Sequence, residues 1–201
     1  MHARSRRALT MRSGVAGVAL CLALLAASVL SPLRAEEPAL QGDAVAYAAE
    51  GDRLFVFLAA TKTEAEGRAM EDEIWRFWMR APDQEAAALM DRAMERRRTY
   101  DFAGAVEILD RLVAIAPGWA EAWNQRATVR FLQEDYEGSL ADIRETLDRE
   151  PRHFGAMAGM AIILLRQGRA ELAQATLHRA VAIHPWLRER SLIVVVPGKD
   201  I

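Results

Sequence analysis

The sequence predicts an all-α fold, an α-solenoid of antiparallel helix pairs, from a repeat that runs through its second half. Three prolines are spaced by 34 residues, Pro117, Pro151 and Pro185. Shifting the chain by 34 residues also places small residues on small ones, as at Ala105, Ser139 and Ala173. A repeat of this period is typical of a two-helix unit that stacks on its neighbours. Because 52 % of the 201 residues are apolar, the chain has enough apolar material for one packed core.

The first element along the chain is a secretory signal peptide over residues 1–35. Five arginines and no acidic residue precede Glu36, and Val15–Leu30 is a 16-residue run without charge. A basic head, an apolar middle and a small residue at Ala35 predict cleavage after that alanine. The Leu-rich run resembles a Sec-type signal, although Arg6-Arg7 leaves twin-arginine export open. An uncleaved anchor fits less well, because a membrane span needs about 20 apolar residues.

Cleavage would place the protein in the periplasm or outside the cell, and it would change the charge of the chain. Removal of residues 1–35 takes away five of the 26 basic residues and none of the 28 acidic ones, so that the net charge goes from −2 to −7. It also removes Cys21, the single cysteine. An acidic mature chain argues against nucleic acid and anionic membranes as partners. We expect no stable membrane anchor after cleavage.

Between the signal and the repeats, we expect a flexible lead-in over residues 36–51 and a degenerate helical hairpin over residues 52–85. Thr63, with Glu66 three residues later, is typical of a capping box that begins the second helix of this hairpin. The apolar faces of its helices are formed by Leu54, Phe55 and Leu58, and by Met70, Ile74, Phe77 and Trp78. The hairpin lacks the small residues of the repeats, as expected of a terminal unit that caps an array.

Three repeats follow, over residues 86–119, 120–153 and 154–187, and each is expected to hold two helices. Small residues such as Ala127 and Ser139 suit the close crossing of these helices. Asp101 and Asp135 can cap the second helix of a repeat by accepting its free N–H groups. A proline ends each repeat, because proline lacks the N–H donor and clashes with the preceding turn.

The repeats resemble the tetratricopeptide repeat family. The residues that carry the resemblance are Trp123, Ala127, Asp135-Tyr136, Ser139, Ile143 and Pro151, with their counterparts in the neighbouring repeats. The resemblance implies that the first helix of each pair lines a concave groove, in which segments of other proteins bind. In this register the groove residues are Met90, Met94, Arg97, Asn124, Thr128, Phe131, Ala158, Ile162 and Leu165.

The groove residues are mostly apolar, and this sets the kind of partner that we expect. Some members of the family hold a C-terminal carboxylate with several Lys, Arg and Asn side chains, whereas here only Arg97 and Asn124 are of that kind. An apolar groove instead suits a hydrophobic segment or an amphipathic helix of another protein. The alternative is that the chain's own N- or C-terminal segment fills the groove.

The first helix of the third repeat is apolar on every face. Residues 154–165 carry no charge, and a helix of this kind must be buried on all sides. The C-terminal tail, the N-terminal helices or a partner could cover it. Gly155 and Gly159 lie on one face of the helix and would let a neighbour approach closely, which favours a role in packing.

Arg126 falls at a position that is usually buried between the two helices of a repeat. A buried guanidinium needs a carboxylate partner, since the desolvation of an unpaired charge costs on the order of several kcal/mol. Asp142 on the facing helix is the nearest candidate, so we expect a structural ion pair between the two. The alternative is a polar ligand pocket that Arg126 forms with Asn124 and His153.

No arrangement of residues predicts catalysis or metal binding. The histidines of the mature chain, His153, His178 and His184, have no second ligand at the spacing of a metal site. The sequence also lacks the metalloprotease, nucleophile-elbow and phosphate-loop motifs. We therefore expect neither a metal nor a cofactor, and we expect a protein that is not an enzyme.

Taken together, the sequence favours an exported interaction module or scaffold. It would bind a peptide or helical segment in the apolar groove and assist assembly in the cell envelope. The alternative is a structural protein that forms a homodimer through its third repeat and its C-terminal tail, residues 188–201, with no peptide ligand. In this tail, Leu192–Val196 is a short β-type run that could lie across the last repeat or pair with another chain.

Overall fold

The computed structural model describes residues 37–194, and it describes their side chains from residue 44 onward. The predicted signal peptide and residues 195–201 lie outside the described residues. A compact unit begins at Gln41. The described part of the chain forms α-helices, one 3₁₀ helix and no strand, and none of its helices is long and apolar enough to cross a membrane.

The elements are α1 (Glu37–Ala60), α2 (Glu64–Trp78), α3 (Gln84–Arg98), α4 (Phe102–Ile115), α5 (Ala120–Leu132), α6 (Tyr136–Arg149), α7 (Phe154–Arg166), α8 (Ala170–Ile183) and η2 (Arg188–Leu192).

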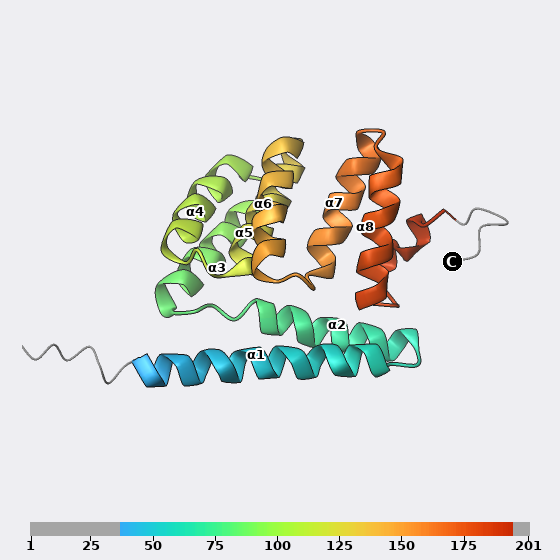
Figure 1. Cartoon of the computed structure of the whole chain (residues 1–201). Helices are drawn as coiled ribbons and strands as arrows, with labels where there is room; N and C mark the ends of the chain where they lie inside the picture. Colours follow the sequence, from blue (N-terminus) through green and yellow to red (C-terminus); the bar gives the residue numbers. More distant parts are fainter. Residues whose placement is uncertain (1–36, 195–201) are drawn as a thin grey trace, which may run out of the picture. The chain divides into compact units, whose positions relative to one another are not determined.

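The helices α3 to α8 form three antiparallel pairs that follow one another along the chain (Figure 1). This arrangement confirms the predicted fold class, because each 34-residue repeat contains two helices. The aspartates before the helices act as caps. Asp101 accepts the N–H of Gly104 at 3.0 Å, and Asp135 accepts the N–H of Gly138 at 2.9 Å. These bonds satisfy N–H groups that a helix cannot satisfy internally.

Small residues lie where the two helices of a pair cross. Ala93, Ala127 and Ala161 on the first helices and Ala105, Ser139 and Ala173 on the second are all buried. In the second repeat the contact also includes a hydrogen bond, in which the Ser139 hydroxyl donates to the carbonyl of Ala127 at 2.8 Å. A larger side chain at these positions would push the helices apart, since protein interiors leave few voids.

The turn inside each pair requires a left-handed backbone at one position. Tyr100 and Glu134 both have a φ of 62°, and Gly168 occupies the matching position of the third repeat with a φ of 72°. Glycine adopts this conformation without a steric penalty, whereas other residues do not. The first two repeats therefore carry backbone strain that the third repeat lacks.

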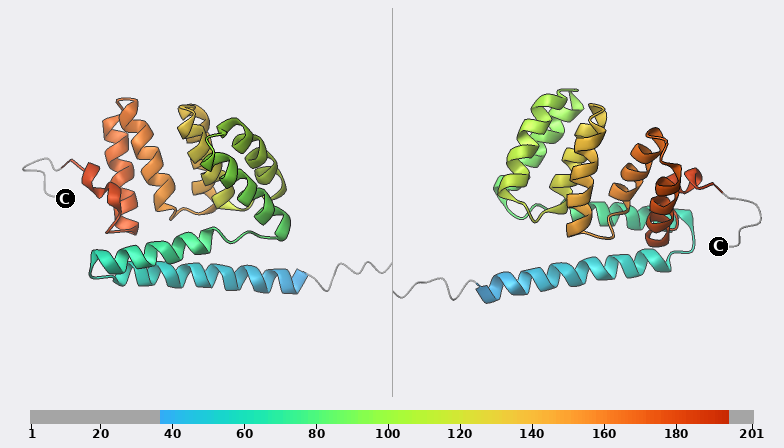
Figure 2. Two further views of the ribbon diagram at one scale, coloured as in Figure 1. Left: turned by 180° about the vertical axis from the view of Figure 1, so that it is seen from behind. Right: turned by 45° about the horizontal axis from the view of Figure 1, so that its top comes forward.

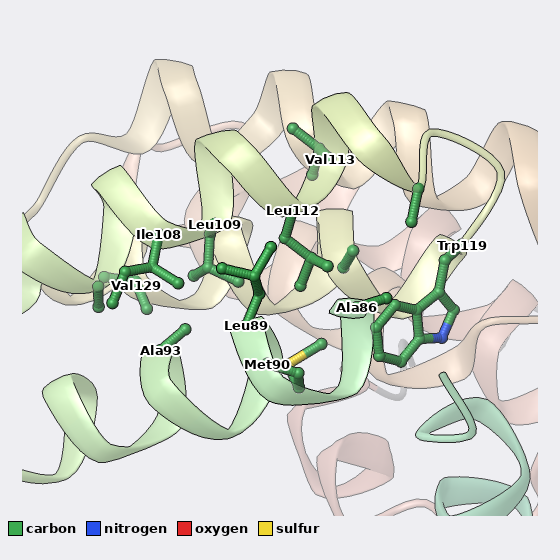
Figure 3. Close-up of a cluster of buried hydrophobic side chains, with 13 residues drawn as sticks. Ala86, Leu89, Met90, Ala93, Ile108, Leu109, Leu112, Val113, Trp119 and Val129 are labelled. Atoms are coloured by element: carbon green, nitrogen blue, oxygen red, sulfur yellow. The ribbon is translucent and has the colours of Figure 1, made fainter. Parts of the chain in front are cut away.

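A continuous apolar core holds the first repeat together and joins it to the second (Figure 3). Leu89 and Met90 of α3 pack with Leu109 and Leu112 of α4, and the indole of Trp119 closes the cluster beside Ala86. Val129 of α5 belongs to the same cluster, so the core passes from one repeat to the next without a break. Continuity of this kind is how stacked repeats bury the faces that a single repeat would expose.

The N-terminal helix is longer than the sequence predicts. Residues 37–60 form one helix, α1, so the expectation of a flexible lead-in over residues 36–51 is wrong for this range. Alanines at 44, 46, 48 and 49 have high helix propensity, which explains the continuation. The helix also has a packing partner, because Tyr47 stacks on Phe77 of α2 with ring centroids 4.3 Å apart.

The hairpin of α1 and α2 packs against the third repeat, although it precedes the first repeat in the chain (Figures 1 and 2). Leu58 of α1 and Ile74 and Trp78 of α2 share a buried cluster with Phe154 and Met157 of α7. A terminal unit that caps an array would instead stack on its neighbour in sequence. Polar contacts support the packing, and they include Asp52 with Arg152 at 2.8 Å, Glu64 with Arg190 at 3.1 Å and Trp186 Nε1 donating to Thr61 Oγ1 at 2.9 Å.

The beginning of the C-terminal tail lies against α8. Leu192 ends η2, and Ile193 packs beside the apolar cluster of α7 and α8. The Gln174 side chain holds the backbone, because its Nε2 donates to the Leu192 carbonyl at 3.0 Å and its Oε1 accepts the N–H of Val194 at 2.8 Å. Residues 192–194 therefore cover part of the last repeat without forming a strand, while the rest of the predicted β-type run lies outside the described residues.

Candidate functional site

An apolar pocket of about 330 Å³ opens between α2, α5 and α7, and we call it the inner pocket. Five of the nine residues that the sequence places in the groove line it, namely Asn124, Thr128, Phe131, Ala158 and Ile162. Trp75 and Glu71 of α2 contribute to its wall, as do Leu187 and Glu189 after α8. The inner faces of α5 and α7 thus meet at one concave site, which contains contributions from the N-terminal hairpin and from the tail.

The other four predicted groove residues do not line the inner pocket. Met90 is 2 % exposed and belongs to the core of the first repeat, against which Met94 also packs. Arg97 donates to Gln125 Oε1 at 2.7 Å, and Leu165 packs against the cluster of α7 and α8. The first repeat therefore contributes no residue to this pocket.

Helix α2 covers much of the apolar helix α7. A Cβ atom on Gly155 would lie 2.7 Å from the Trp75 indole, so this glycine is required for the close approach of α2. Trp75 and Trp78 both pack against Phe154. Of the three ways to cover α7 that the sequence left open, the described structure shows two, because the N-terminal helices pack on one part of α7 and Ile193 of the tail packs on another.

A carboxylate from α2 stands at the edge of the inner pocket. Glu71 Oε2 lies 3.2 Å from His184 Nε2, and Glu71 Oε1 lies 3.4 Å from Trp75 Nε1. The hydrogen bond from His184 lowers the pKa of Glu71, and partial burial opposes that effect without cancelling it. Glu71 is therefore held as a carboxylate at the pocket. His184 Nδ1 is buried without a hydrogen-bond partner among the described residues.

A buried polar network lies behind the pocket, and Glu121 is at its centre. Glu121 is 1 % exposed and accepts hydrogen bonds from Asn124 at 3.2 Å, from Gln125 and from His153 Nε2 at 3.0 Å. His153 Nδ1 in turn accepts the N–H of Ala156 at 3.1 Å and caps α7. A ring nitrogen that accepts a backbone N–H cannot carry a proton, which fixes the proton of this histidine on Nε2.

The structure brings Arg126 and Asp142 together, and it separates Arg126 from His153. Arg126 binds Asp142 with two bonds, Nε to Oδ2 at 2.9 Å and Nη2 to Oδ1 at 2.7 Å, and it also meets Asp110 at 2.8 Å. Burial alone would lower the pKa of Arg126, but the bonds and charge of Asp142 and Asp110 raise it. Arg130 adds a further bond to Asp142 at 2.9 Å. The polar ligand pocket considered as an alternative is not formed, because Asn124 and His153 meet on Glu121.

Sequence reasoning missed the pocket residues Glu71, Trp75, Leu187 and Glu189, and it also missed Glu121, which is buried next to the lining residue Asn124. A glutamate in the first turn of a helix is favoured by the helix dipole and is usually solvent-exposed. The one local signal is its apolar surroundings, since residues 119–123 read Trp-Ala-Glu-Ala-Trp. A charged residue in such a run is a candidate for burial with hydrogen-bond partners.

A larger hollow of about 610 Å³ lies elsewhere, and its arginines are already paired. Its lining includes Arg80 and Arg149. Arg80 forms an ion pair with Glu50 at 2.8 Å, and Arg149 forms one with Glu145 at 2.7 Å. Because neither arginine lacks a carboxylate, this hollow has less to offer a charged partner than the inner pocket.

The described residues include no candidate metal centre. Among the side chains of residues 44–194, no group of three or more His, Cys, Asp or Glu residues could hold a metal ion. His153 and His184 are buried in structural hydrogen bonds, and His178 is exposed on α8. The inner pocket itself offers an apolar floor and carboxylates at its edge.

Comparisons with known proteins agree on the repeat. The profile of the tetratricopeptide repeat family matches residues 130–185. A TPR repeat-containing protein of Rhizobium etli is 35 % identical over 137 residues, which cover 67 % of this chain and 66 % of that protein. Tetratricopeptide repeat protein 36 of Bos taurus is 29 % identical over 140 residues, which cover 67 % of this chain and 72 % of that protein.

A solved structure shows the same fold. The TPR2B domain of yeast Sti1, in its complex with pHsp70, superposes with a TM-score of 0.50 at 18 % identity. The match covers 54 % of this chain and 87 % of that domain. At this identity the similarity concerns the arrangement of the helices alone.

Proposed function

We propose that this chain, which is a tetratricopeptide-repeat protein, is an exported interaction module that binds a segment of another protein in the inner pocket. Tetratricopeptide-repeat proteins generally mediate protein–protein interactions. The observation that carries the proposal is the inner pocket itself, where the half-buried side chains Phe131 and Ile162 line an apolar hollow on the inner helices. In our proposal the bound segment belongs to a protein that is being assembled in the cell envelope.

Peptide selection tests the binding proposal directly. A phage-displayed library of random peptides is panned against the mature chain, against Phe131→Glu and Ile162→Glu, and against Leu132→Glu as an exposed neighbour on the same helix. We expect the wild type and L132E to enrich the same peptides and both pocket variants to lose them, because a carboxylate in the pocket opposes apolar contact. Circular dichroism shows whether each variant is folded. No enrichment by the wild type, or enrichment that both folded pocket variants retain, would contradict the proposal.

The predicted signal peptide supports the export part of the proposal. The full chain is expressed in a Gram-negative host, and the N-terminus of the purified product is determined by mass spectrometry. We expect the product to begin at Glu36 and to come from the periplasmic fraction. A cytoplasmic product that retains residues 1–35 would argue against export.

Self-association is the second candidate function, and exposed apolar side chains on α1 favour it. Val45, Val56 and Phe57 are 69 %, 67 % and 59 % exposed. A second copy of the chain could cover these residues, since exposed apolar groups often mark contacts between proteins. Light scattering on the wild type and on Phe57→Glu distinguishes the two functions. A dimer that F57E dissociates supports self-association. If both proteins are monomers, self-association is excluded and the binding module is the remaining candidate.

A further inference from the structure

We infer that the inner pocket selects a cationic apolar segment, in which an apolar side chain enters the pocket and a neighbouring lysine or arginine meets Glu71 and Glu189. This inference rests on the proposed function, because it names the class of partner for the same pocket. It concerns the charge that the partner carries beside its apolar group.

The charged residues that line the inner pocket are both acidic. They are Glu71 of α2 and Glu189 of η2, and the lining contains no lysine or arginine. Glu189 is half-buried and forms no salt bridge with a described side chain. A carboxylate that is partly desolvated and unpaired is stabilised by an incoming cation and is destabilised further by an anion.

The cationic groups near Glu71 and Glu189 lie outside the lining of the inner pocket, in a neighbouring hollow that contains Arg68, Arg188 and Arg190. The hydrogen bond to Glu71 comes from His184, which does not line the pocket. Arg188 lies near enough to help lower the pKa of Glu71, but it is exposed and does not line the pocket. Arg190 is already paired with Glu64 at 3.1 Å. The charged groups that the inner pocket itself presents to a partner are therefore two carboxylates.

The remainder of the pocket determines the apolar part of the partner. Phe131, Ile143, Phe154 and Ile162 provide the apolar surface. The volume of about 330 Å³ is near the lower end of the range of about 300–1,000 Å³ for ligand pockets. Because α2 and Leu187 form part of the wall of this small pocket, the space suits one or two side chains of a segment better than a whole helix face.

The experiment uses the same random peptide library and reads the residues next to the apolar positions of the enriched peptides. Panning is repeated on Glu71→Gln/Glu189→Gln and on Glu107→Gln/Glu137→Gln, which removes two exposed acids on α4 and α6. Both double variants change the net charge equally, so they separate the local effect of the pocket from the general attraction of an acidic protein. The three most enriched peptides are then synthesised with their basic residues retained or replaced by Glu, and binding is measured by fluorescence anisotropy.

We expect Lys and Arg to be enriched over Asp and Glu in peptides selected by the wild type and by E107Q/E137Q. With the wild type, replacement of the basic residues by Glu should weaken binding about tenfold, and E71Q/E189Q should reduce this difference to about twofold. Equal binding of both peptide forms to the wild type would overturn the inference. An equal loss of the preference for basic residues in the two double variants would also overturn it. Either result would leave the proposed function intact. A library that yields no peptide at all would contradict the proposed function itself.

Discussion

The indole of Trp78 lies flat on the imidazole of His153, with ring centroids 3.9 Å apart and ring planes that differ by 10°. The stack joins the end of α2 to the residue that caps α7. His153 holds the buried carboxylate of Glu121 on α5 at the same time. One pair of rings thus fixes the N-terminal hairpin to two of the three repeats, and it sets the wall of the inner pocket that α2 provides.

Replacement of Trp78 by alanine should destabilise the protein strongly. Trp78 is 3 % exposed, and the loss of a buried indole typically costs about 3–5 kcal/mol because a cavity remains. The measurement is urea unfolding followed by circular dichroism. Arg53→Ala, an exposed position on the same hairpin, is the control and should change the free energy of unfolding by about 0.5 kcal/mol or less. A loss below about 1 kcal/mol in W78A would mean that α2 is not held at the third repeat.

Arg126→Ala should cost far more stability than the loss of a surface arginine. The change leaves Asp142, which is 1 % exposed, with Arg130 as its remaining charged partner, and breaking a buried pair costs about 3–5 kcal/mol. Because Arg130 remains, we expect the lower end of this range. Arg98→Ala removes an exposed pair with Glu95 and should cost less than about 1 kcal/mol. Similar unfolding midpoints for the two variants would refute the structural role of Arg126.

Glycine at the left-handed turn positions should stabilise the protein. Tyr100 and Glu134 have a φ of 62°, where a residue with a Cβ atom loses about 1–2 kcal/mol. Glycine also has more freedom in the unfolded chain, so we expect Tyr100→Gly and Glu134→Gly each to gain about 0.5–1 kcal/mol. The gains should add, since the two turns lie in different repeats. Gly168→Ala is the matched reverse change and should lower the melting temperature.

The stability that Glu71 provides should depend on pH. Its pKa is lowered in the folded protein, first by the hydrogen bond from His184, so its contribution is complete above the unfolded value of about 4.3. The contribution is lost as the pH falls through the lower folded value. Glu71→Gln should therefore be about 1 kcal/mol less stable than the wild type at neutral pH, and the difference should shrink below about pH 4. Thermal unfolding across this range tests the prediction, with Glu107→Gln as the control. A difference that stays constant down to pH 3 would contradict it.

The sequence predicts the fold because its information is local and repeated. The 34-residue spacing, the aspartate caps and the small residues each act within one helix pair, and all of them appear in the structure as expected. Gly155 even indicates the close approach on α7, although the sequence does not say that Trp75 makes it. A repeat that is visible in the chain therefore leads directly to the architecture.

The site was harder to predict, because it depends on contacts between distant segments. The apolar face of α2 is clear from Ile74 and Trp78, but nothing local states which repeat it packs against. Met90 has the right register for the groove and is buried in the core of the first repeat instead. In the sequence Glu121 has the features of an ordinary residue in a first helical turn, and only the structure shows His153 beside it. These residues are defined by tertiary packing, and periodicity does not contain that information.

The docking of the N-terminal hairpin on the third repeat also affects the order in which the protein can fold. Asp52 and Arg152 are 100 residues apart in the chain, and Glu64 and Arg190 are 126 residues apart. As the chain emerges from its N-terminus, Trp75 and Trp78 come early, and their partners on α7 come much later. An array with contacts only between neighbours can fold as each repeat emerges. Here the hairpin waits with its aromatic face in water until the last repeat is complete, a state in which chains are prone to aggregate.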